Sequence, residues 1–174
     1  KDTTARNGQW RQGPGIDFFR AVQQTLGQKD IIAEDLGYLT DSVRQLLRET
    51  GYPGMKVLEF AFADRENGSD YLPHCYTPHC VVYTGTHDND TIQGWMRSVA
   101  PCAVEYAKDY LRLSEREGYH WGMIRSAWAS AADLAVIQLQ DLLGLGSEGR
   151  MNHPATTSEN WEWRTLPGSY GPVL

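Results

Sequence analysis

The chain has 174 residues and a formal charge of −6, and its 41% hydrophobic and 22% charged residues are ordinary for a globular protein. An acidic chain is a poor match for nucleic acid, because phosphate binding needs clustered Lys and Arg. No apolar run approaches the roughly 20 residues of a membrane span, and the opening residues do not resemble a signal peptide. We therefore expect no nucleic-acid or membrane partner and a cytoplasmic location.

Apolar residues at helical spacing predict four helices. Asp17 is expected to cap the first helix, and Thr40 is expected to cap the second, which ends at Gly51. Pro101 is expected to begin the third helix. The fourth, over residues 121–131, has the strongest apolar stripe.

Short apolar runs predict strands between these helices. The run over residues 57–62 is nearly all apolar, as expected for a strand buried on both faces of a parallel sheet. The other runs cover residues 31–33, 81–83 and 135–137. Strands that alternate with helices indicate βα units and a parallel sheet.

The predicted fold is α/β, the C-terminal portion of a (β/α)₈ TIM barrel that is incomplete in this chain. The 174 residues are fewer than the roughly 250 of a full barrel, so only part of one is expected. We expect a single partial catalytic domain over residues 1–174. Residues 147–174, rich in Gly, Pro, Asn and Trp, are expected to form an irregular packed C-terminal segment.

Glu34 is the first candidate catalytic residue. The run over residues 31–33 is expected to deliver it to the end of a strand, beside Asp35. A neighbouring negative charge and partial burial favour a protonated carboxyl group, which can donate to a leaving oxygen. The alternative, a solvated strand end or a helix-capping pair, stays open at this point.

Asp88 is the second candidate and lies between His87 and Asn89, after the strand over residues 81–83. These three side chains can hydrogen-bond several adjacent hydroxyls, which is what a pyranose ring presents. A polar loop in which Asp88 or Asp90 caps the following helix is an equally good interpretation.

Two His and two Cys residues fall within the seven positions 74–80 and are the ligand types that zinc prefers. His74, Cys75, His79 and Cys80 are nevertheless expected to bind no metal, because their spacing suits a tetrahedral site poorly. A hydrolase built from Cys80, His87 and Asp88 lacks any signature of such a family. With Cys102 the chain has three cysteines, an odd number that does not suggest a set of disulfide bonds. We therefore expect neither a metal nor another cofactor.

Several motifs together resemble the amylomaltase family of 4-α-glucanotransferases, in the α-amylase clan. They keep the order and spacing of that family from about residue 8 to residue 164. Their residues are 31–37 (IIAEDLG), 54–62 (GMKVLEFAF), 82–91 (VYTGTHDNDT), 141–146 with 150–152, and 160–164 (NWEWR). A single motif of this kind can occur by chance, but the whole set, in the same order and at the same spacing, is specific to the family.

The resemblance implies an enzyme that transfers α-1,4-glucan segments between maltooligosaccharides with retention of configuration. Glu34 matches the general acid/base of the family, and Asp88 matches the carboxylate that holds the ring hydroxyls and stabilises the transition state. His87 matches a histidine that binds the same sugar. Substrate-binding roles are expected for Asn89, Arg150 and Asn152 as well.

The chain also departs from the family pattern. The family's nucleophilic aspartate lies on a strand with an Arg-x-Asp-His pattern. That pattern is absent here, so the resemblance implies a C-terminal half that is inactive alone. Ala155 replaces the usual glycine. An α-glucan hydrolase and a non-catalytic glucan-binding fragment stay open as alternatives. The uncovered edges of a partial barrel are expected to promote self-association.

Overall fold

The computed structural model describes residues 4–9, 11–37, 39–63, 65–66, 68–169 and 171. It forms a mixed α/β fold with two compact units, one from Lys1 to Gly54 and the other from Met55 to Leu174. That the chain is one partial catalytic domain stays a prediction. Among the described residues, the helices are all too short or too polar to cross a membrane.

The first unit is helical and contains η1 (Ala5–Asn7), α1 (Ile16–Leu26) and α2 (Asp41–Thr50), with α1 packed against α2. The predicted cap of α2 is confirmed, because the Thr40 hydroxyl accepts the Val43 N–H at 3.4 Å. Gly51 ends this helix in the left-handed conformation, as expected. The predicted cap of α1 is wrong. Gly15 occupies the N-cap position, and Asp17 in the first turn pairs with Arg20 instead.

The expected strand over residues 31–33 does not form, and residues 27–36 contain no helix or strand. The Ala33 N–H donates to the Pro53 carbonyl at 2.9 Å. This contact does not extend into a strand ladder. Glu34 therefore lies, exposed, in an irregular segment of the first unit.

The second unit contains a three-stranded sheet in the order β1 (Gly54–Val57), β2 (Cys80–Tyr83) and β3 (Leu134–Val136). Strands β2 and β3 are parallel, as predicted, with Val82 opposite Ala135. The strand expected over residues 57–62 is wrong, because β1 ends at Val57 and the chain turns into η2 (Leu58–Phe62). A short apolar run has no periodicity that distinguishes a buried strand from a buried helical turn.

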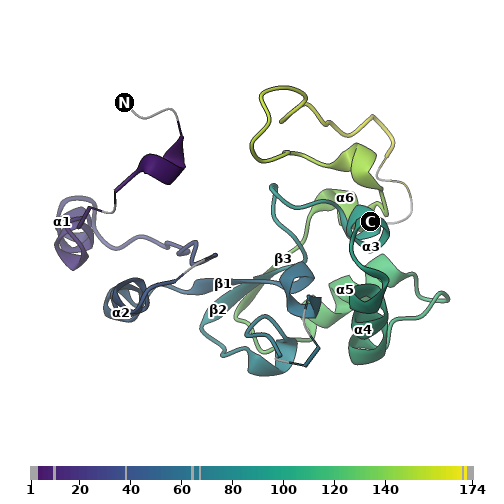
Figure 1. Ribbon diagram of the computed structural model, residues 1–174, viewed down its shortest axis with the longest axis horizontal. Coiled ribbons are helices and arrows are strands. Elements are labelled where there is room, and N and C mark those ends of the chain that lie inside the picture. Colours follow the sequence, from purple (N-terminus) through teal and green to yellow (C-terminus); the bar gives the residue numbers. More distant parts are fainter. Residues whose placement is uncertain are drawn as a thin grey trace. The chain divides into compact units, whose positions relative to one another are not determined.

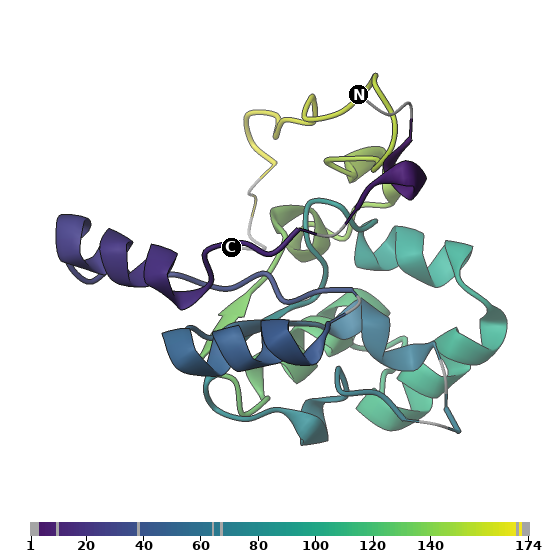
Figure 2. The same ribbon diagram turned by 60° about the vertical axis from the view of Figure 1, so that its left-hand side comes forward.

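Helices cover this sheet, and Figures 1 and 2 both show α4 and α5 side by side. Pro101 begins α4, as predicted. Helix α5 ends before residue 131, because Ser130 donates its hydroxyl and its N–H to the Ala127 carbonyl and the chain turns there. The helical elements are η3 (Pro73–Cys75), α3 (Ile92–Ser98), α4 (Pro101–Leu111), α5 (Tyr119–Trp128), α6 (Leu139–Leu142) and η4 (Ser147–Gly149).

An aromatic cluster around Phe62 forms the centre of the core. Its ring lies 5.6–6.2 Å from the rings of Trp95, Tyr106 and Tyr110, so η2, α3 and α4 meet at one side chain. Cys80 and Val82 of β2 are buried in the same core, and Val81 is also almost fully buried. This packing holds the C-terminal end of β2 in place, and the polar loop begins there.

Candidate active site

The loop after β2 is shaped by hydrogen bonds among its own residues. Asn89 accepts both the N–H and the hydroxyl of Thr86 on Oδ1, at 2.9 and 2.8 Å. The Asp88 N–H in turn donates to the Thr86 hydroxyl at 3.3 Å. The amide oxygen of Asn89 therefore braces the loop, while its expected contact with substrate stays a prediction.

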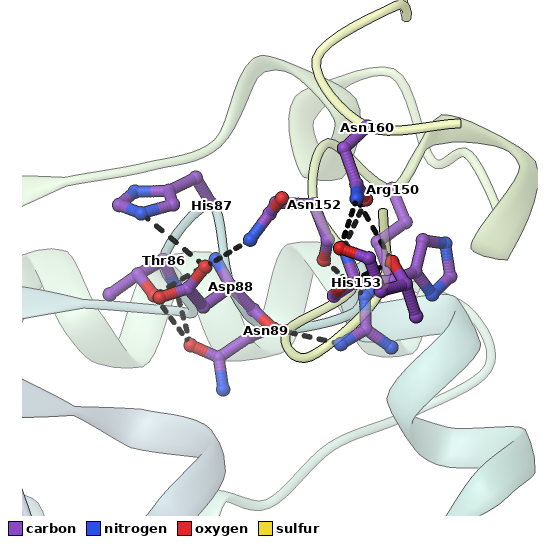
Figure 3. A network of polar contacts seen from close by, with 9 residues as sticks. Thr86, His87, Asp88, Asn89, Arg150, Asn152, His153 and Asn160 are labelled. Carbon is purple, nitrogen blue, oxygen red and sulfur yellow. Dashed lines mark hydrogen bonds and ion pairs between the residues drawn. The ribbon is translucent and has the colours of Figure 1, made fainter. Parts of the chain in front are cut away.

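Asp88 stands at the centre of the polar network in Figure 3. Asn152 donates from Nδ2 to Asp88 Oδ1 at 2.6 Å, and His87 Nε2 lies 3.4 Å from the same oxygen. Both the His87 and Asp88 side chains are about half exposed, at 50% and 46%. Among the described residues no hydrogen bond reaches Asp88 Oδ2, so that oxygen is free to accept donors from solvent or a ligand.

The helix after this loop does not use Asp88 as a cap. The Thr91 hydroxyl accepts the Gly94 N–H at 3.1 Å, and the first N–H of α3, from Ile92, donates to Asp141 at 2.7 Å. Asp90 accepts the Thr91 N–H and the Ser147 hydroxyl. The N-cap of α3 is therefore Thr91, and neither Asp88 nor Asp90 takes that position.

The segment after η4 closes the site from a distant part of the sequence. Arg150 donates from Nη2 to the Asp88 carbonyl at 2.8 Å and from Nε to the Asn152 carbonyl at 2.9 Å. The Arg150 guanidinium group therefore links the backbone at Asp88 to the backbone at Asn152. The structure thus brings Arg150 and Asn152 together with His87 and Asp88, while the substrate-binding roles expected for these residues stay predictions.

A buried acidic cluster lies near the base of this loop. Asp141 is fully buried and accepts the Thr84 hydroxyl at 2.8 Å as well as the Ile92 N–H, and burial raises its pKa to about 6. Burial, aided by the charges of Asp141 and Asp90, raises the pKa of Glu59 well above its ordinary value. Glu59 Oε1 has no hydrogen-bond partner among the described residues. The surroundings of Glu59 therefore favour the neutral form of its carboxyl group.

Glu34 and Asp88 belong to different compact units. Asp88 follows a parallel strand, as expected from the sequence. The strand expected before Glu34 is absent, as described above.

The His/Cys segment has other contacts. His74 Nδ1 lies 2.6 Å from the Tyr110 hydroxyl, and Cys80 is buried at the start of β2. His87 and Asp88 follow the opposite end of that strand, so a hydrolase site with Cys80 does not fit. The described residues contain no group of three or more metal-ligating side chains.

Both the sequence and the fold match known proteins. Residues 1–167 match the sequence pattern of the 4-alpha-glucanotransferase family. The chain belongs to that family. The 4-alpha-glucanotransferase of Clostridium butyricum is 46% identical over 164 residues, which cover 94% of this chain and 34% of that protein. The chloroplastic/amyloplastic enzyme of Solanum tuberosum is 48% identical over 163 residues, 93% of this chain and 28% of the relative.

A solved amylomaltase structure has a similar fold. The amylomaltase from Streptococcus agalactiae in complex with acarbose superposes with a TM-score of 0.91 at 37% identity, covering 97% of this chain and 34% of the other. The chain spans about a third of the length of these family members, not the half that the motifs suggested.

Sequence reasoning missed three residues near this candidate site. Asp141 and Trp161 lie within motifs of the family, but nothing in their spacing indicated the hydrogen bond of Asp141 to Thr84 or the ring contact of Trp161 with His87. Glu59 was assigned to a strand that does not extend so far. The available signal was a carboxylate inside an otherwise apolar run, which predicts a buried acid.

Proposed function

We propose that this chain is part of a 4-α-glucanotransferase that transfers α-1,4-glucan segments between maltooligosaccharides by a retaining double displacement. The observation that carries the proposal is Asp88, a half-exposed carboxylate with one oxygen held by Asn152 and His87 and the other free. Family membership and the acarbose named with the Streptococcus agalactiae structure support a glucan as the ligand.

The geometry of Asp88 suits a sugar ring with two neighbouring hydroxyls. The Asn152 contact fixes the carboxylate plane, so the free Oδ2 presents its lone pairs in a defined direction. An oxocarbenium-like transition state carries positive charge, which a preorganised carboxylate stabilises more than it stabilises the neutral ground state. His87, at 3.4 Å from Oδ1, can donate to Asp88 or to a sugar hydroxyl.

Glu34 is proposed as the general acid/base. It would protonate the oxygen of the departing glucan and then take the proton of the incoming 4-hydroxyl. Retention also needs a carboxylate nucleophile about 5–5.5 Å from the acid/base, and the proposal places that residue outside this chain. An acceptor sugar that reaches the covalent intermediate before water makes the enzyme a transferase.

The fold is proposed to be part of a (β/α)₈ barrel of a cytoplasmic enzyme that needs no cofactor. Support comes from the parallel β2–β3 pair with the polar loop at the C-terminal end of β2. Leu134 and Val136 on the edge strand β3 remain 49% and 38% exposed. Neighbouring parts of a complete barrel would cover such apolar side chains.

The test uses the full-length enzyme that contains this chain, with maltotriose as the only substrate. Wild type is expected to give longer and shorter oligomers with little net gain of reducing ends. Asp88→Asn is expected to lower kcat by about 10²–10³-fold, because it removes a preorganised charge. Glu34→Gln should lower kcat by about 10²–10⁴-fold, because it removes the proton donor.

Exposed Asp133 provides the matched control, and Asp133→Asn should leave kcat unchanged. If reducing ends rise in proportion to maltotriose consumed, the enzyme is a hydrolase and the transfer step of the proposal is wrong. Full activity in Asp88→Asn would overturn the role of the loop.

A further inference from the structure

Trp161 is a large aromatic side chain held open to solvent beside the candidate site. Its side chain is 53% exposed, whereas Trp95 in the same unit is almost completely buried. An indole ring left open to water forgoes much of the hydrophobic free energy it could gain by burial. Such exposure beside a polar site indicates a surface that is covered when a ligand binds.

The backbone of Trp161 is strained into this position. Its φ is 64°, in the left-handed region that bulky residues rarely adopt, and Ala155 and Glu159 in the same loop also have positive φ. The Trp161 N–H donates to the Met151 carbonyl at 2.7 Å, and Arg164 Nη1 donates to the Trp161 carbonyl at 2.8 Å. Strain held by specific hydrogen bonds is characteristic of ligand-binding positions.

Contacts link this ring directly to Asp88. The Trp161 and His87 ring centroids are 4.9 Å apart with an interplanar angle of 39°, and His87 Nε2 lies 3.4 Å from Asp88 Oδ1. The bond to Met151 anchors Trp161 to the residue that precedes Asn152, the donor to Asp88. The indole and the carboxylate are therefore positioned by one connected set of contacts.

We propose that Trp161 is a stacking platform for a glucose ring of an α-1,4-glucan, next to the ring that Asp88 holds. A pyranose has an apolar C–H face and an edge of hydroxyls, so it needs an aromatic surface beside polar acceptors. The neighbouring carboxylate favours a neutral sugar over an anionic ligand. The inference rests on the proposed function and deepens it by assigning a subsite.

The test compares Trp161→Ala, Trp161→Phe and Trp128→Ala in the full-length enzyme, with maltotriose and maltoheptaose as substrates. Trp128 on α5 is 56% exposed and serves as the matched control. Trp161→Ala is expected to raise KM about tenfold, in the range seen when a contacting Trp is truncated, and to leave kcat nearly unchanged. KM should change and kcat should not, because stacking on the indole ring stabilises the bound substrate and the transition state by the same amount.

Trp161→Phe keeps an aromatic face and should recover most of the affinity, whereas Trp128→Ala should behave as wild type. A fall in kcat with unchanged KM, matching His87→Ala, would show that Trp161 only supports His87 and would overturn the inference. If wild type forms no longer oligomers from maltotriose, the proposed function fails. The subsite is then judged by calorimetric binding of maltoheptaose alone, and equal Kd for wild type and Trp161→Ala would overturn it.

Discussion

The buried Asp141 should give the chain a pH-dependent stability that Asp141→Asn removes. Asp141 joins the end of β2 to the start of α3 through Thr84 and Ile92. Burial raises its pKa from 3.8 to about 6 in the folded chain, so the folded state binds this proton more tightly than the unfolded state. The resulting stability is fully present below about pH 4 and is lost as the pH rises through about 6.

The magnitude follows from these two pKa values. At about 1.4 kcal/mol for each pH unit, the full effect is about 3 kcal/mol, of which about 2 kcal/mol falls between pH 4.5 and pH 7.5. Asparagine keeps the size of the side chain and an oxygen that can accept the Ile92 N–H, but it cannot titrate. The free energy of unfolding of wild type relative to Asp141→Asn should therefore fall by about 2 kcal/mol across that range.

Urea unfolding of the chain, followed by tryptophan fluorescence at both pH values, measures this difference. Two protein concentrations separate unfolding from self-association. Asp133→Asn at an exposed position is the control and should follow wild type within about 0.5 kcal/mol. If Asp141→Asn has the same pH dependence as wild type, the argument from burial is refuted.

Three further predictions concern the chain itself. Chain 1–174 should not disproportionate maltotriose, and adding the remainder of the enzyme should restore an activity that Glu34→Gln removes; activity of the chain alone would contradict this. Ala155→Gly should raise the free energy of unfolding by up to about 1 kcal/mol, because φ is 65° and glycine tolerates it; an unchanged urea midpoint would refute this. Zinc should not bind at residues 74–80, so elemental analysis after dialysis against zinc should give the same metal content for wild type and a Cys75→Ser, Cys80→Ser double variant.

Features that depend on neighbouring residues could be predicted from the sequence. The Thr40 cap, the end of α2 at Gly51 and the start of α4 at Pro101 follow from the conformational preferences of those residues. The parallel pairing of β2 followed from an apolar run bounded by helices. Family membership followed from motifs in register, and Asp88 was placed correctly after β2.

Features that depend on distant segments were decided only by the tertiary structure. Asn152 lies 64 residues from Asp88 in the sequence and Asp141 lies 57 from Thr84, yet each pair shares a hydrogen bond. The apolar run before Glu34 contacts Pro53 through the Ala33 N–H but does not pair as a strand, and its composition did not reveal this. The open face of Trp161 likewise arises from its contact with His87 and a strained turn. Local conformational preferences determine where a helix or strand begins and ends. Burial and hydrogen bonds between distant segments determine which side chains come together at the candidate site.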